Sequence, residues 1–238
     1  MFLIDRIKHQ LHQDIVADPV LHARVLNLYL CGEAYPHAVN DYFPVAAVRD
    51  PDLAEAMRQH QADEDKHIAL YAKAIQKLGE PVQQLPPEHI FNHVIRQHSA
   101  ETWHVEPEMA DDQRTRRVAS FLAHAHILEK RVARSLEYHL EACNRAADPY
   151  PAKAVAAVLG DEQRHVSYTH DAVFHLLPRA EAAALLRSHE RAEARANLDF
   201  SSNQLRRLLR EETQHWPTAR RGFYRACAAV MRGVLHCA

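Results

Sequence analysis

The sequence predicts an all-α protein: a four-helix bundle of two antiparallel hairpins joined by a long crossover, with additional N- and C-terminal helices. One pentapeptide pattern occurs twice, as Asp63-Glu64-Asp65-Lys66-His67 and Asp161-Glu162-Gln163-Arg164-His165. A single glutamate precedes each copy, because Glu33 lies 64 − 33 = 31 residues before Glu64 and Glu129 lies 162 − 129 = 33 residues before Glu162. The chain has only 5 Gly in 238 residues and is 47% hydrophobic, which suits long helices around one core.

Turn signals fall where two hairpins need them. If the members of each glutamate pair lie at the same height, the chain must reverse near residues 48 and 146. Asp50-Pro51 and Asp148-Pro149 each offer a helix N-cap followed by proline at the first helical position. The chain therefore divides into two similar hairpins, each with a glutamate on its first helix and Asp-Glu-x-x-His on its second.

Apolar periodicity and turn residues predict the individual helices. Pro36 and Pro44 are expected to kink or break the first ligand helix just beyond Glu33. We interpret residues 1–238 as a single domain, with a core bundle at 19–177 and a helical extension at 178–238. A short amphipathic segment is expected near 2–15, and the four ligand helices are expected from 19, at about 51–78, at 111–146 and at 151–177. The crossover between the second and third ligand helices should contain a helical stretch at 89–104. The extension should contain one long helix and a last helix at 220–235.

The spacing of Glu and His in the repeated pattern indicates metal binding. A Glu at i and a His at i+3 lie about 60° apart around a helix and roughly 4.5 Å apart along it, so both can reach one metal ion. The four glutamates also fall on the apolar stripes of their helices, and buried carboxylates are very costly unless they bind cations or one another. Asp63 and Asp161 can hold the second ring nitrogen of a ligating histidine. The sequence thus predicts a dinuclear metal centre.

These motifs resemble those of the ferritin-like di-iron carboxylate superfamily, which includes rubrerythrins, bacterioferritins, ribonucleotide reductase small subunits and di-iron oxygenases. The resemblance covers roughly residues 19–177 and implies two iron ions; the spacing alone also admits manganese or a mixed Mn/Fe pair. It implies that Asp63 and Asp161 pair with the histidines across the bundle. The implied roles are bridging for Glu64 and Glu162, terminal for Glu33 and Glu129, and one metal each for His67 and His165.

Such a site activates O2 or peroxide. The leading hypothesis is a di-iron oxidoreductase that oxidises or hydroxylates a small organic substrate, reduced by a separate electron-donor protein because the chain has no Gly-rich nucleotide fingerprint. The alternatives are a rubrerythrin-like peroxidase or ferroxidase, and a non-catalytic structural bundle whose glutamates do not converge. An oxygenase predicts an apolar cavity lined by small residues such as Ala125, Ala133 or Ala172.

Two tyrosines are candidate catalytic residues. Tyr29 lies one turn before Glu33, and Tyr168 lies about one turn after His165, so each could act beside an activated oxygen species. Each can equally be an ordinary core or capping tyrosine.

Composition excludes several other classes of protein. The formal net charge is −2, which gives no global electrostatic case for a nucleic-acid or membrane-surface partner. The four cysteines form no C-x-x-C pair, which argues against a rubredoxin-type iron site and favours a reducing, cytoplasmic location. The sequence contains no signal-peptide core and no membrane-length apolar run. A homodimer is a possible assembly.

Overall fold

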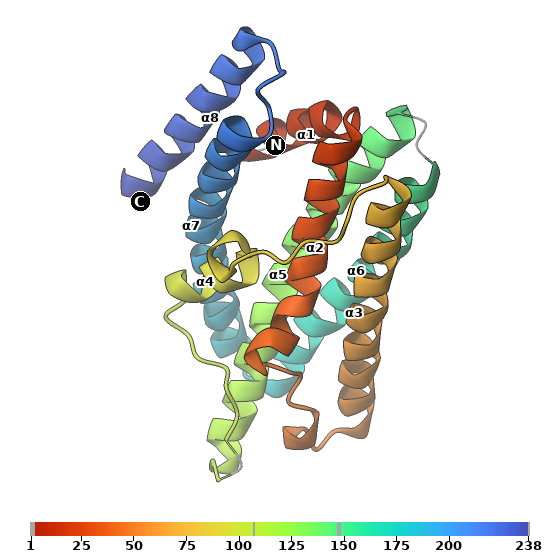
Figure 1. Ribbon diagram of the computed structural model, residues 1–238. Helices are drawn as coiled ribbons and strands as arrows, with labels where there is room; N and C mark the ends of the chain where they lie inside the picture. Colours follow the sequence, from red (N-terminus) through yellow and green to blue (C-terminus); the bar gives the residue numbers. More distant parts are fainter. Residues whose placement is uncertain (1–2, 107, 147–148, 238) are drawn as a thin grey trace.

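A computed structural model, which describes residues 3–106, 108–146 and 149–237, confirms an all-helical bundle with extra helices. Figure 1 shows the four ligand helices together, with the C-terminal helices on one side. The elements in chain order are α1 (Leu3–Val16), α2 (Pro19–Val39), the 3-10 turn η1 (Val45–Ala47), α3 (Pro51–Lys77), the 3-10 turn η2 (Pro87–His89), α4 (Phe91–His98), α5 (Asp111–Ala146), α6 (Pro149–Leu176), α7 (Arg179–Glu211) and α8 (Thr218–Cys237).

The four ligand helices are arranged as two antiparallel hairpins, α2 with α3 and α5 with α6. Helices α3 and α5 run in the same direction, as a long crossover requires (Figure 1). The crossover passes over α2, where the Asn27 side chain accepts a hydrogen bond of 2.8 Å from the backbone N–H of Gln83. Helix α4 then packs on α7, which in turn contacts α5 and α8. None of the described helices is both long and apolar enough to cross a membrane.

The helix starts follow the predicted capping signals. The Asp18 carboxylate accepts from the N–H groups of Val20 and Leu21, and the Asp50 carboxylate caps α3 in the same way. Proline follows each aspartate at the first helical position. Helix α6 begins at Pro149, whereas the predicted cap Asp148 lies outside the described residues.

Of the two outcomes predicted at Pro36, a kink or a break, the break is wrong. Helix α2 continues through Pro36 and ends before Asn40, which has the left-handed φ of 53° and whose N–H bonds the Pro36 carbonyl. Pro36 has no N–H to offer the carbonyl of Gly32, one turn earlier. The side-chain amide of Asn92 on α4 donates to that carbonyl instead, at 3.3 Å. Pro44 lies beyond the end of the helix.

The crossover helix is shorter than predicted, because it ends at His98 rather than near residue 104. The Ser99 hydroxyl accepts from the N–H of Glu101 at 3.2 Å, and such local bonds compete with helix continuation. The chain then runs without helix to Trp103, which is buried, stacks on the His124 ring at 3.9 Å and donates to Asp41. This contact anchors the end of the crossover on α5.

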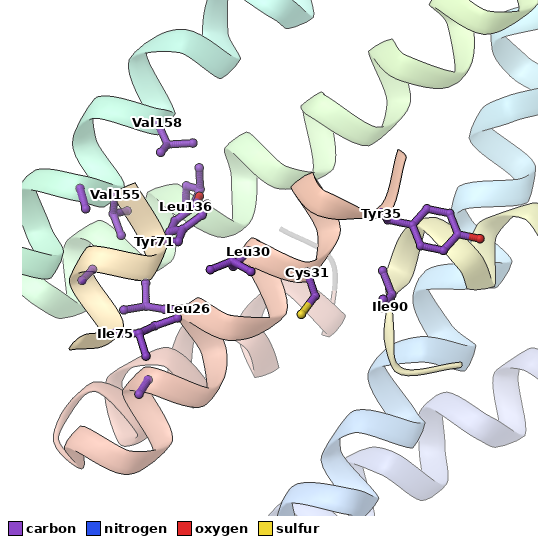
Figure 2. Close-up of a cluster of buried hydrophobic side chains, with 13 residues drawn as sticks. Leu26, Leu30, Cys31, Tyr35, Tyr71, Ile75, Ile90, Leu136, Val155 and Val158 are labelled. Atoms are coloured by element: carbon purple, nitrogen blue, oxygen red, sulfur yellow. The ribbon is translucent and has the colours of Figure 1, made fainter. Parts of the chain in front are cut away.

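Two apolar clusters fill the bundle at its two ends. Leu26, Tyr71, Leu136 and Val155 belong to the first, and Figure 2 shows how they meet from four helices. The second cluster includes Met57, Leu122 and Val173. On each ligand helix the glutamate lies between, or just beyond, the residues that enter these clusters. The carboxyl groups therefore form one polar layer between the two apolar clusters.

We expect the Asn92 side chain to stabilise α2 at Pro36. Asn92→Ala leaves the Gly32 carbonyl without its donor and should lower the free energy of unfolding by about 1 kcal/mol. The matched background is Pro36→Ala, which restores a backbone N–H. In the Pro36→Ala background, Asn92→Ala should lower the free energy of unfolding by less. Urea denaturation of the wild type, the two single variants and the double variant measures the difference. Equal costs in both backgrounds would contradict the assigned role of Asn92.

Candidate metal centre

The structure brings the six predicted ligands together. Their side-chain donor atoms form overlapping groups in the described chain, and within each group all donor atoms lie within 4.8 Å of one another. Glu64 and Glu162 each belong to two groups, which suits the bridging role that the resemblance implies. The groups are Glu33 with His67 and Glu162, Glu64 with Glu129 and Glu162, and His60 with Glu64 and His165.

His60 is a candidate metal ligand that the sequence analysis missed. Its Nε2 lies 3.1 Å from Glu64 Oε1 and 3.4 Å from Glu129 Oε1, and its ring stacks on that of His165 at 3.6 Å. Its side chain is fully buried. The signal was present, because His60 lies four residues before Glu64 on the same apolar stripe.

Each of the two predicted histidine ligands, His67 and His165, is oriented by an aspartate of the other hairpin. Asp63 contacts His165 Nε2 at 3.3 Å, and Asp161 contacts His67 Nε2 at 3.2 Å. In both cases the Nδ1 atom faces the glutamates. Each histidine is thus paired with an aspartate from the other hairpin, as the resemblance implies. The contact orients each ring through the nitrogen that does not face the glutamates.

Basic residues cover the two aspartates. Lys66 Nζ lies 2.6 Å from Asp161, and Arg164 donates to Asp63 at 3.4 Å and also to Asp161. Lys66 and Arg164 hold the same place in the two pentapeptides. Burial raises the pKa of Asp161, but hydrogen bonds from Lys66, His67 and Arg164 outweigh it and lower the pKa to about 2. Both aspartates are therefore ionised when they hold the histidines.

The crowded glutamates have strongly perturbed pKa values. Burial and neighbouring carboxyls raise the pKa of Glu33 and Glu162 well above the ordinary range, and raise that of Glu64 to about 8. Burial also opposes ionisation of Glu129, but hydrogen bonding and attraction to His60 lower its pKa to about 2. Without a cation this layer therefore stays partly protonated.

Several buried atoms in the layer point to a bound cation. Glu64 Oε1, Glu162 Oε1 and His67 Nδ1 are buried and have no hydrogen-bond partner within the described residues. A buried polar atom without a partner is costly, and bound cations would satisfy these atoms. Burial lowers the pKa of His67, and it lowers the pKa of His165 to about 4. Both rings are therefore neutral and able to bind metal. Carboxylate and imidazole donors suit iron and manganese.

The two candidate tyrosines lie in different surroundings. The Tyr168 hydroxyl is 2.7 Å from His60 Nδ1 and so reaches the donor cluster through that ring. The Tyr29 hydroxyl is directed to His139 Nδ1 at 3.3 Å, away from the glutamates. Tyr71, which the sequence analysis treated only as a stripe residue, has a buried hydroxyl whose pKa is raised by burial and by Glu33.

A cavity of about 240 Å³ opens onto one side of the donor cluster. Glu33, His60, Glu64 and Glu129 form its inner wall, and most of its other lining side chains from α1, α2, α4, α5 and α7 are apolar. Of the small residues expected there, Ala125 lines the cavity.

Ala133 and Ala172 do not belong to the cavity wall, so that part of the expectation is wrong. Ala172 packs in the apolar cluster at the far end of the bundle. The cavity instead lies between α2 and α5, where the Tyr29 and Val132 side chains face it from the two helices.

The fold and donor set define a helical bundle with a candidate dinuclear carboxylate centre. The chain belongs to the ferritin-like domain family, whose profile matches residues 26–175. This range contains all six predicted ligands and His60. Searches of curated proteins and of solved structures gave no match.

We expect Glu162→Ala to remove at least one metal ion per chain, because Glu162 joins two donor groups. Elemental analysis of protein purified without chelator measures the change. Glu137→Ala, an exposed position on α5, is the matched control and should retain full metal content. Unchanged metal content in Glu162→Ala would support a purely structural bundle.

Metal binding at pH 7 should release protons. Glu64, with its pKa raised to about 8, is mostly protonated at pH 7 and mostly ionised at pH 9, so a cation displaces more protons at pH 7. Calorimetric titrations in two buffers of different ionisation enthalpy measure the number of protons released at each pH. Equal release at pH 7 and pH 9 would contradict the raised pKa.

Proposed function

We propose that this protein is a di-iron oxidoreductase that uses O2 to oxidise or hydroxylate a small, largely apolar organic molecule. The observation that carries the proposal is the apolar cavity that ends at Glu33, Glu64 and Glu129. A substrate bound there would lie directly beside the candidate metal ions. A ferroxidase, in contrast, needs a hydrophilic route for iron, which the apolar wall does not favour.

The chain's own residues would prepare the site for this chemistry. Two bound iron ions would supply O2 binding and two electrons. Asp63 and Asp161 hold the ligating rings, and the apolar wall excludes water from the reacting groups. The contact between Tyr168 and His60 Nδ1 places an exchangeable proton one ring away from Glu64 and Glu129. Electrons would come from a separate protein, since the chain carries no nucleotide fingerprint.

Two of the basic side chains in the cavity wall, Lys8 and Arg131, favour a substrate with an anionic group. Lys8 and Arg131 both line the cavity, and burial followed by repulsion from Arg131 lowers the pKa of Lys8 well below its ordinary value. Lys8 donates to the Asn197 side chain at 2.7 Å, and Arg131 lies 3.5 Å from Glu193. A carboxylate between Lys8 and Arg131 would relieve their repulsion.

The function is tested by a single turnover. Iron-loaded protein, chemically reduced and mixed with ¹⁸O2 and a set of apolar acids, should consume O2 and yield a product that is dehydrogenated or carries ¹⁸O. Glu162→Ala should abolish the product. The protein could instead reduce peroxide or oxidise ferrous iron at a rate that does not change when an organic acid is added. That result would favour the peroxidase or ferroxidase alternative.

Recognition of the anionic group of the substrate is tested separately, with octanoate and its methyl ester as probes. Lys8→Met should weaken octanoate binding to the iron-loaded protein by roughly tenfold and leave the ester unaffected, since a charge-assisted hydrogen bond contributes about 1.5–3 kcal/mol. Lys153→Met, an exposed position, serves as the control. Calorimetry measures both affinities. An equal loss for the acid and the ester would contradict recognition of the charge.

A further inference from the structure

A second cluster of side chains that could hold a metal ion lies between α2 and α5, apart from the glutamates. It consists of His22 on α2 with His139 and Cys143 on α5, and all three residues are fully buried. One donor atom from each lies within 4.8 Å of the others. His139 lies ten residues after Glu129 on α5, so the two clusters are about 15 Å apart along the helix at about 1.5 Å per residue.

The distances approach those of a tetrahedral zinc site. His22 Nε2 lies 2.8 Å from His139 Nε2 and 3.7 Å from Cys143 Sγ. Zinc bonds of about 2.0–2.1 Å to nitrogen and about 2.3 Å to sulfur place tetrahedral donors roughly 3.3 Å and 3.6 Å apart. The nitrogens need to separate by about half an ångström, which side-chain rotation allows. His139 and Cys143 share one face of α5 because they are four residues apart.

The surroundings of the cluster also fit a metal site. The second nitrogen of His139, Nδ1, contacts the Tyr29 hydroxyl at 3.3 Å, which is the outer hydrogen bond that orients a ligating imidazole. Burial lowers the pKa of His139, so its ring is neutral and can bind a cation. His12 on α1 packs its ring 5.2 Å from that of His139, and its buried Nδ1 has no hydrogen-bond partner in the described chain. A water molecule would take the fourth position, as in zinc sites with three protein ligands.

We propose that His22, His139 and Cys143 form a second, mononuclear site for a borderline-soft divalent ion, with Zn²⁺ as the best match. A thiolate and two imidazoles select such an ion, whereas the carboxylate-rich centre suits harder ions. The site ties α2 to α5 beside the cavity that separates them, and it fixes Tyr29 in the cavity wall through His139. The proposal is independent of the oxidation chemistry.

Cobalt substitution tests the site, because Co²⁺ bound to a thiolate gives a near-ultraviolet charge-transfer band that a carboxylate and imidazole centre lacks. Wild-type protein should show this band, and Cys143→Ser should lose it. Cys143→Ser should also lose one equivalent of zinc per chain while the carboxylate centre keeps its metal. Cys227→Ser, a buried thiol outside the cluster, is the matched control and should change neither. Absence of the band in wild type, or equal zinc content in wild type and Cys143→Ser, would overturn the proposal.

A measurement on the wild-type chain covers the case in which Cys143→Ser does not fold. Zinc X-ray absorption of protein carrying a single equivalent of zinc should report one sulfur ligand, with nitrogen and oxygen at the other three positions. A shell of only oxygen and nitrogen would place the zinc at the carboxylate centre and overturn the proposal. Glu162→Ala provides the reverse comparison, because it should keep the cobalt–thiolate band while losing metal from the carboxylate centre.

Discussion

The structure depends on one electrostatic constraint: four glutamates, three of them buried and Glu33 half-buried, are held in a single layer of a helical bundle. Burial and mutual repulsion raise the pKa of Glu33, Glu64 and Glu162, while His60 keeps Glu129 ionised. Such a layer is costly without cations, and the two apolar clusters on either side of it must supply the stability that it removes. The orienting aspartates and their basic partners are consequences of the same requirement, because they hold the ligands in place before metal arrives.

The ligand layer could be predicted because its signal is local and repeated. Glu-x-x-His places two donors on one helical face whatever the rest of the fold does, and the second copy in register with a turn confirmed the first. The failures have non-local causes. Helix α2 continues past Pro36 because Asn92, 60 residues after Gly32 in the sequence, supplies the Gly32 carbonyl with the donor that Pro36 lacks. His60 was not predicted as a ligand because, in the sequence, a single histidine on an apolar stripe does not distinguish a core histidine from a metal ligand. The cavity depends on how far α2 and α5 separate, which no residue pattern encodes.

The two halves of the bundle are similar but not equivalent. His60 precedes Glu64 by four residues, and the corresponding position before Glu162 is Val158, which lies in an apolar cluster. The cavity also reaches the layer on the side that includes His60 and Glu64. The side of the centre that faces the cavity therefore has an additional imidazole, which the other half of the bundle lacks. A molecule in the cavity approaches the centre from the side of His60 and Glu64.

The exchange of aspartates between the hairpins has a consequence for how the chain assembles. His67 depends on Asp161 and His165 depends on Asp63, so neither hairpin contains the partner of its own histidine. An isolated hairpin would lack the aspartate that contacts the second ring nitrogen of its histidine. Two identical halves could satisfy each other, and a fused chain does so within one molecule. Ordered histidines in the layer thus require that the two halves have already docked.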